Sequence, residues 1–272
     1  MTALPHFVVS TAIVCASVAA LTCLLGSSQR SPSSPASMRR WVEPATGMTF
    51  VELPPGTFEM GSPAGESDRE AGEVQHRVTL SRPTWMAIHE VTQRQWFEVM
   101  GTRPSHFAGD DERPVERVSW DDAHAFLARL SAHAAGSRFR LPTEAEWEYA
   151  CRAGTHTAFA LGDALSPTQA NIGRLVGNRL EGRGQTTAVG SFTPNAWGLY
   201  DLHGNVWEWV EDAHCPYVVD GPSDPVGRCA SPLKVIRGGS WAFSAANARC
   251  ALRYTHRPQD VGYSLGFRVV RD

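Results

Sequence analysis

The sequence lacks the features that mark several large classes of protein. It has no long run of Lys or Arg, and its 25 basic and 28 acidic residues give a formal net charge of -3. A nucleic-acid partner is therefore not indicated, because such partners need a basic footprint. The ten histidines form no His-x3-His or His-Glu-x-x-His pattern, which excludes the zinc site of the metalloproteases that carry the latter motif. No internal repeat is apparent.

The composition is that of a globular, loop-rich protein. Of the 272 residues, 42% are hydrophobic and 19% charged, with 24 Gly, 18 Pro and 9 Trp. Gly and Pro set turns, and bulky aromatic rings fill an interior that has few long helices. One domain suffices for a chain of this length.

The N-terminal region predicts export. The segment Phe7–Gly26 has no charged residue and is long enough to cross a bilayer as a helix. A polar, Ser/Pro-rich stretch follows. We expect residues 1–26 to be a signal peptide or an N-terminal membrane anchor, 27–45 a linker and 46–272 the domain. The residues before Phe7 include no Lys or Arg, so both readings stay open. In either case the domain is periplasmic, extracellular or anchored facing outward, and it meets a membrane only through this segment.

Four cysteines fall in the domain, where an exported protein keeps disulfides. Cys15 and Cys23 lie in the targeting segment, and the remaining four allow three pairings: they are Cys151, Cys215, Cys229 and Cys250. The nearest pair, Cys215 with Cys229, would close a loop rich in Pro, Gly and Asp.

Local patterns predict an α+β domain. Three helices are expected at capping boxes, in which a Ser or Thr and an acidic or amide residue three positions on satisfy free N–H groups: Thr92 with Gln95, Ser119 with Asp122, and Thr143 with Glu146. A hairpin is expected from strands at 48–53 and 57–60, and another strand at 76–80. The acidic segment 63–74 between them predicts a solvent loop.

Seven segments in order give the domain a family resemblance: LPPGTFEMG (53–61), EVTQRQW (90–96), PVERVSWD (114–121), RLPTEAEWEYACRA (140–153), NAWGLYDLHGNVWEW (195–209), RGGSW (237–241) and GYSLGFRV (262–269). They resemble the formylglycine-generating enzyme family, also called the sulfatase-modifying factor family. The resemblance implies a loop-rich variant of the C-type lectin fold with bound calcium. It also implies a Cys151–Cys250 disulfide, which leaves Cys215 to pair with Cys229.

The resemblance implies two structural calcium sites, since calcium takes six to eight oxygen ligands from irregular loops. The first would use the side chains of Asp201 and Glu208 and the carbonyls of Gly204 and Val206. The second would use Asn171, the Ile172 carbonyl, Glu181 and the Arg183 carbonyl. Asp201 stands where the family often has Asn. The alternative is that Glu208 pairs with an Arg.

The same family oxidises a substrate cysteine with copper(I) held by two thiolates, ligands that this soft ion selects. In the family, a Cys-x4-Cys pair follows the Gly-Gly-Ser motif. Here Gly238-Gly239-Ser240 leads to Phe243 at the first cysteine position, and the second falls in a shortened stretch without Cys. Cys250 has the context of the structural disulfide. Copper is therefore not expected.

What remains of the implied cleft is Ser240, Trp207, Trp241, Arg253 and Arg268, which could bind a peptide or small ligand. The alternative is that the two Trp are core and the two Arg pair with buried carboxylates. Two functions stay open: a non-catalytic, monomeric domain that binds a peptide, glycan or protein, or an oxidoreductase of the family.

Overall fold

The computed structural model describes residues 1–2, 38–134, 136–177 and 179–272 of the chain. Residues 38–272 belong to one compact unit, Pro32–Asp272. The predicted targeting segment, with Cys15 and Cys23, lies outside the described residues. Among those described, no helix has the length and apolar character needed to cross a membrane.

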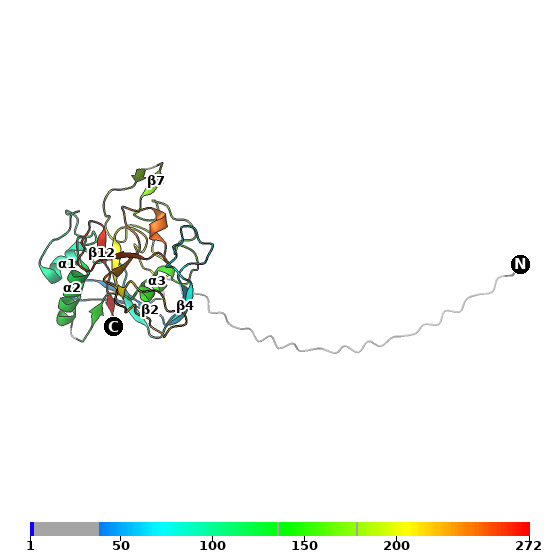
Figure 1. Ribbon diagram of the computed structural model, residues 1–272, viewed down its shortest axis with the longest axis horizontal. Helices are drawn as coiled ribbons and strands as arrows, with labels where there is room; N and C mark the ends of the chain where they lie inside the picture. The colour runs from blue at the N-terminus through cyan, green and yellow to red at the C-terminus, as the bar shows by residue number, and fades with distance from the viewer. Residues whose placement is uncertain (3–37, 135, 178) are drawn as a thin grey trace. The chain divides into compact units, whose positions relative to one another are not determined.

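Three α-helices begin at the three predicted capping boxes: α1 (Gln93–Met100), α2 (Trp120–His133) and α3 (Glu144–Arg152). In each, the Ser or Thr side chain accepts from the N3 backbone N–H, and the N3 side chain accepts from the cap backbone N–H. Figure 1 shows α1 beside α2. A 3-10 helix, η2 (Ala245–Ala248), lies near the C-terminal end.

The strands form two sheets and two ribbons. The five-stranded antiparallel sheet has the order β1 (Arg40–Val42), β2 (Thr49–Leu53), β5 (Thr84–Ala87), β13 (Val270–Arg271) and β6 (Phe139–Arg140). The four-stranded sheet has the order β11 (Tyr254–His256), β10 (Lys234–Arg237), β9 (Trp207–Ala213) and β12 (Leu265–Phe267), with β12 parallel to β9. The ribbons are β3 (Gly56–Met60) with β4 (His76–Leu80), and β7 (Arg174–Val176) with β8 (Arg179–Glu181). This mixture confirms the predicted α+β class.

Two local expectations were wrong. Residues 48–53 and 57–60 do not form a hairpin, because β2 pairs with β1 and β5 while all five residues of β3 pair with β4. Regular structure also begins earlier than expected, at β1, inside the segment 27–45 that was assigned to the linker. Trp41 on β1 packs on Phe50 of β2 at 5.4 Å between ring centroids and on Phe139 at 6.3 Å. This aromatic contact gives β1 the apolar anchor that a linker does not have.

Helix α3 runs through the interior, since all nine of its residues are buried. Four of them are charged, so the core around α3 must pair charges as well as pack apolar groups. Arg237 of β10 pairs with two of these carboxylates. Its Nη2 donates to Glu148 at 2.5 Å, and its Nη1 lies 3.3 Å from Glu144. Arg152 also pairs with Glu148, at 2.8 Å. Two arginines and two glutamates therefore neutralise one another at the centre of the domain.

Two disulfides close the chain on itself, Cys151–Cys250 and Cys215–Cys229. The first is the pair that the resemblance implied, and the second is the pair that it left by subtraction. The first joins the end of α3 to the segment after η2. The second closes a short surface loop, residues 215–229, which we call the disulfide loop. Both bonds are consistent with an exported domain.

Candidate functional site

The two sets of predicted calcium ligands lie side by side. The backbone of Asn171 forms an isolated bridge with Gly204, and the Asn205 N–H donates to the Asn171 carbonyl at 2.9 Å. Only glycine fits at 204: its φ is 93°, and an added Cβ would come within 2.3 Å of the Asn171 carbonyl oxygen. The Asn171 amide donates to Asn205 Oδ1 at 3.1 Å, which joins the two loops through their side chains.

Glu208, on β9, is held by two donors in the core. Arg268 approaches with both edges of its guanidinium, Nη2 to Oε1 at 2.6 Å and Nε to Oε2 at 2.7 Å. The indole N–H of Trp147 donates to Oε2 at 2.6 Å. Glu208 thus pairs with an Arg, as the alternative interpretation of the sequence allowed. Arg268 is buried here and not on a cleft wall.

The carboxylates around Arg268 outnumber its single positive charge. Glu90, Asp201 and Glu208 all interact electrostatically with that guanidinium. Burial raises the pKa of Glu90 well above its usual range, and repulsion from Asp201 and Glu208 adds to the rise. Burial also raises the pKa of Asp201 to about 6, although the Gly190 N–H donates to its carboxylate. The interior here has an excess of negative charge that a bound proton or a cation would relieve.

The second predicted ligand set contains an unsatisfied oxygen. Asn171 Oδ1 is buried and has no hydrogen-bond partner among the described residues, while the amide nitrogen donates to Gln185 O and Asn205 Oδ1. Gly182 lies close to this point, since a Cβ there would be 3.3 Å from the Ile172 carbonyl oxygen. Buried amide oxygens are normally hydrogen-bonded. An oxygen-binding cation fits the Asn171 Oδ1 position.

The remaining members of that set are at the surface. Glu181 is the exposed last residue of β8, and its carboxylate has no partner among the described residues. Arg183 is exposed as well, and its guanidinium donates to the Pro167 carbonyl. The structure therefore brings buried and exposed candidate oxygens to the same loop region.

The segment after the Gly-Gly-Ser motif has no free thiol. Gly238 and Gly239 both have positive φ, and Ser240 behind them is fully buried. Phe243 occupies the position of the first family cysteine and packs on Trp207, with ring centroids 5.5 Å apart. Cys250, the nearest cysteine, is joined to Cys151.

His203 lies against that disulfide and completes a group of three potential metal ligands within 4.8 Å of one another. Its Nδ1 is 2.7 Å from the Ala248 carbonyl, so this nitrogen carries the proton, and Nε2 accepts from the Ala160 N–H at 3.0 Å. Burial lowers the pKa of His203 to about 4, which keeps the ring neutral. The disulfide uses both sulfurs, so no thiolate is offered to a metal.

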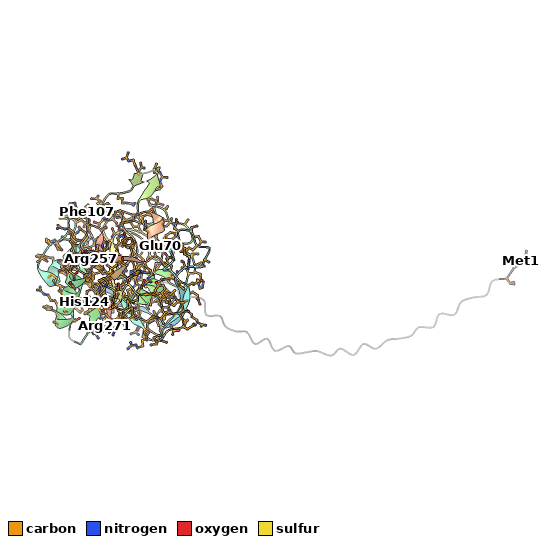
Figure 2. The ribbon with its side chains drawn as sticks, viewed as in Figure 1. Met1, Glu70, Phe107, His124, Arg257 and Arg271 are labelled. Carbon is orange, nitrogen blue, oxygen red and sulfur yellow. A yellow bond between two sulfur atoms is a disulfide. The ribbon has the colours of Figure 1, made fainter. Side chains whose placement is uncertain are left out.

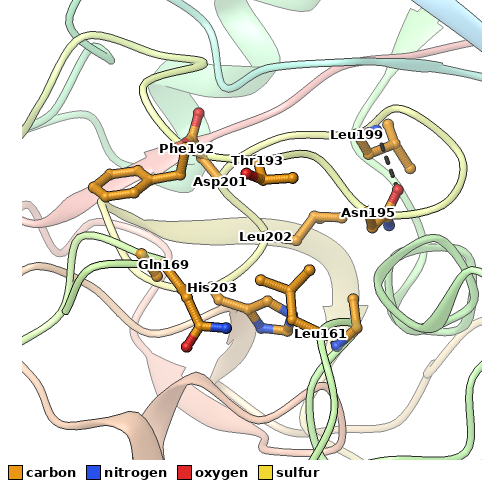
Figure 3. A pocket seen from close by; sticks show the side chains of 11 residues that line it. Leu161, Gln169, Phe192, Thr193, Asn195, Leu199, Asp201, Leu202 and His203 are labelled. Atoms are coloured by element: carbon orange, nitrogen blue, oxygen red, sulfur yellow. Dashed lines mark hydrogen bonds between the residues drawn. The ribbon is translucent and has the colours of Figure 1, made fainter. Parts of the chain in front are cut away.

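The small pocket beside His203 has room for little more than one water-sized group. Its volume is about 20 Å³, and Asp201, Asn195 and Gln169 are among its lining residues. Figure 3 shows the imidazole of His203 together with these side chains. An organic substrate needs a cavity of several hundred Å³. This pocket does not replace the expected cleft.

Four of the five expected cleft residues are core residues, and we correct that expectation; the fifth, Trp241, is half-buried. Trp207 is 2% exposed and Ser240 fully buried. Arg253 lies with Nε 2.7 Å and Nη2 2.8 Å from the two Glu144 oxygens. The reason is the charge composition of α3, whose buried carboxylates need arginine partners from other strands. Sequence spacing does not reveal pairs that are more than 100 residues apart.

An exposed aromatic surface adjoins the same segment, and the sequence analysis identified only one of its residues, Trp241. We call it the aromatic face: His106, Phe107, Trp241, Tyr254 and Tyr263. Phe107 meets Trp241 edge-on at 5.3 Å, and His106 lies 4.4 Å from Tyr263, centroid to centroid. The Trp241 indole N–H donates to the Tyr263 carbonyl at 3.2 Å. Figure 2 labels Phe107.

Tyr254 lies on the edge strand β11 beside the buried Trp207, and among the described residues its ring makes no aromatic contact with the other four residues of this face. It stacks on the buried Trp207 at 5.6 Å, and it is 45% exposed, compared with 54% for Tyr263. Tyr263 lies inside the motif GYSLGFRV, which the sequence analysis used only for the resemblance, and Tyr254 lies outside the seven motifs.

The acidic loop 63–74 is also less exposed than its composition predicts. Arg249 reaches into it, with Nη1 2.7 Å from Glu66 and Nη2 2.7 Å from Glu73. These hydrogen bonds and charges lower the pKa of Glu73 against the opposing effect of burial. The predicted solvent loop is therefore fastened to the residue next to Cys250.

The fold and the motifs define a class of C-type-lectin-like α+β domains, and comparison with known proteins defines the family. The profile described as "Sulfatase-modifying factor enzyme 1-like domain" matches residues 37–272. The chain belongs to this family, and its fold is the formylglycine-generating-enzyme variant of the C-type lectin fold.

Relatives named formylglycine-generating enzyme match most of the domain. The enzyme of Streptomyces coelicolor is 39% identical over 203 residues, 70% of this chain and 61% of its own length. That of Mus musculus is 38% identical over 216 residues, 71% of this chain and 56% of its own length. The chain thus matches less than two thirds of either relative. Among solved structures, PvdO from Pseudomonas aeruginosa is 31% identical with a TM-score of 0.75, covering 86% of this chain and 98% of that one.

Proposed function

We propose that this chain is an exported binding domain that has kept the family scaffold without the oxidase chemistry, and that it engages a peptide, glycan or protein partner. The observation that carries the proposal is the state of the cysteines. All four in the described domain are in disulfides, and Phe243 occupies the first position of the family's copper-binding pair. Copper(I) needs free thiolates, and this segment offers none.

The aromatic face is the surface proposed for the partner. Tyr and Trp give large contact areas at low entropic cost and combine apolar rings with polar groups, which is why they are enriched in protein interfaces. Here Trp241 lies in the segment 240–250 of the implied cleft, and Phe107 and Tyr263 contact it. Arg117 lies over the Tyr263 ring at 5.7 Å, which adds a positive charge at the edge of the face. These features favour a polypeptide over a glycan.

The family's oxidoreductase activity is the competing function, and one assay separates the two. The purified domain is incubated with copper(I), oxygen and a Cys-x-Pro-x-Arg peptide, with the Streptomyces coelicolor enzyme as positive control. Mass spectrometry then follows loss of the thiol and gain of an aldehyde. We expect no turnover by this chain, and aldehyde formation above a peptide-only blank would refute the proposal.

The same peptide, with serine in place of the cysteine, tests binding without chemistry. We expect Tyr254→Ala and Tyr263→Ala each to weaken binding of a recognised peptide by about tenfold, the usual cost of an aromatic contact residue. Val42→Ala, at an exposed apolar position on β1, is the matched control and should leave binding unchanged.

We also propose that calcium stabilises the domain at the two ligand sets described above. The unsatisfied Asn171 Oδ1 and the excess of carboxylates around Arg268 support this proposal. In the first set, Asp201 and the carbonyls of Gly204 and Val206 would hold the ion, with Glu208 shared between the ion and Arg268. In the second, Asn171, the Ile172 carbonyl, Glu181 and the Arg183 carbonyl would hold it. Calcium would supply positive charge and tie loops together, with no part in any reaction.

A further inference from the structure

A cavity of about 300 Å³ lies between the disulfide loop, the β3–β4 ribbon and the start of α3. We call it the disulfide-loop cavity. Its size falls at the lower end of the range for sites that bind small organic molecules. It shares no lining residue with the aromatic face or the predicted calcium ligands, so it is a separate feature of the molecule.

Its walls are mostly apolar. They include Met60 and Val78 from the ribbon, Ala145 from α3, and, from the disulfide loop, Pro216, Val218, Pro222, Pro225 and Val226. The Cys215–Cys229 bond also lines the cavity and fixes the loop across it. A loop that is covalently closed over an apolar space maintains that space without needing a large core of its own.

The charged groups in the interior of the cavity have hydrogen-bond partners within the protein. Arg253 pairs with Glu144 through two hydrogen bonds and lies over the Tyr217 ring at 4.0 Å. Asp212 accepts from the backbone N–H groups of Glu144 and Gly227. Burial, with repulsion from Glu144, raises the pKa of Asp212 to about 7, so this carboxyl carries little negative charge below neutral pH.

Two arginines that line the cavity have no acidic partner among the described residues. Arg77 and Arg228 are both exposed, and neither has a hydrogen-bond or ion-pair partner among the described residues. Glu59 is the cross-strand neighbour of Arg77, yet the two side chains form no ion pair. The cavity therefore combines apolar walls with an uncompensated positive charge among its exposed lining residues.

We propose that the disulfide-loop cavity binds a small organic anion with an apolar body, such as a medium-chain carboxylate. The apolar part would lie against the proline and valine walls, where it is removed from water. The carboxylate would lie between Arg77 and Arg228, whose guanidinium groups bind carboxylates well. This inference does not depend on the proposed partner of the aromatic face.

Isothermal titration of the folded domain with three eight-carbon probes tests the charge preference. Octanoate, octan-1-ol and octylammonium have the same chain and differ in head group. We expect octanoate to bind with a dissociation constant below about 1 mM, at least tenfold more tightly than octan-1-ol, and octylammonium to bind more weakly still. No detectable octanoate binding, or equal affinity for octanoate and octan-1-ol, would overturn the proposal.

Variants locate the site. Arg77→Gln combined with Arg228→Gln should weaken octanoate binding at least tenfold and leave octan-1-ol binding unchanged. Arg82→Gln is the matched control, because Arg82 is exposed, unpaired among the described residues and lines a neighbouring groove instead. Val226→Trp, which fills the cavity, should weaken octanoate and octan-1-ol alike. If Arg82→Gln weakened octanoate as much as the double change, the attraction would be a general surface effect and the proposal would fail.

Discussion

Asp201 is a half-buried carboxylic acid at a position where the family resemblance implies an amide. In the unfolded chain an aspartate titrates near pH 4, whereas burial raises the pKa of Asp201 to about 6 in the folded state. Between these two values the folded protein binds more protons than the unfolded chain. Stability from this group is therefore present at low pH and is lost as pH rises through about 6.

Asp201→Asn should remove that loss. In calcium-free buffer we expect the wild-type free energy of unfolding to fall relative to the variant by on the order of 2–3 kcal/mol between pH 4 and pH 7. Urea titrations at several pH values measure the difference. Asp260→Asn is the control, because the pKa of exposed Asp260 is lowered, chiefly by the Arg257 N–H. A constant difference between wild type and Asp201→Asn over this pH range would contradict the assignment.

At the scale of single residues, the sequence indicated which charged residues matter but not which of them pair with one another. From the sequence, Glu208 was expected to bind calcium or to pair with an Arg, and in the structure it pairs with Arg268 in the core. That Arg268 holds it does not follow, because 60 residues separate the two and several arginines were possible partners. The cleft assigned to Ser240 and Arg253 failed for the same reason, since pairing across the fold decides which charges are buried.

The capping box at the start of helix α3 also positions the buried charges that the helix carries. Thr143 Oγ1 accepts from the Glu146 N–H at 3.1 Å, and the Glu146 carboxylate accepts from the Thr143 N–H at 2.8 Å. The same carboxylate binds both terminal nitrogens of Arg140, at 2.6 and 2.7 Å. The cap thus fixes the start of the helix that carries Glu144, Glu148 and Cys151.

Thr143→Ala should lower the free energy of unfolding by about 1–2 kcal/mol, because one backbone N–H loses its acceptor at a partly buried helix end. Thr143→Ser keeps the hydroxyl and should cost less than half as much. Chemical denaturation of the two variants beside the wild type measures both values. Equal losses would show that the lost methyl group, and not the hydrogen bond, matters.

At the scale of helices and strands, the sequence predicted the features that depend only on residues close together in the chain. All three capping boxes were found, because a cap is defined within four residues. The predicted hairpin of β2 and β3 does not form, because β2 pairs with β5 and β3 pairs with β4. A turn motif between two strands carries no information about such competing strands. The buried ends of the acidic loop were missed because Arg249, their partner, lies 176 residues from Glu73.

The domain as a whole has long irregular segments between few regular elements, which is the situation in which bound calcium contributes most to stability. With calcium at 100 times its dissociation constant, binding adds about 2.7 kcal/mol per site. For a domain of this size we expect the melting temperature to fall by about 5–10 °C for each site that a chelator empties. Calorimetry with calcium, with magnesium and with chelator measures the shift.

Glu181→Gln separates binding from folding. The Glu181 carboxylate is exposed and has no partner among the described residues, so the variant should melt like the wild type in chelator. In calcium it should show a smaller gain. Identical melting curves for wild type with calcium and with chelator would rule out both sites.

For the whole domain, the family motifs predicted the class of fold and the Cys151–Cys250 pair, and the Cys215–Cys229 pair followed by subtraction. They did not predict the disulfide-loop cavity or the aromatic face. Each is assembled from segments far apart in the chain, such as Val78 with Val226 and Phe107 with Trp241. The motifs specify the scaffold, whereas a surface depends on how separate loops are brought together.

The two disulfides are nested, since the 14-residue separation of Cys215 and Cys229 lies inside the 99-residue separation of Cys151 and Cys250. A protease that cuts one peptide bond between residues 151 and 250 therefore releases no fragment. A cut within the disulfide loop leaves ends that are joined by both bonds. An exported protein with this covalent topology can be nicked in its longest irregular region and still remain one molecule, and the cut becomes visible only after reduction.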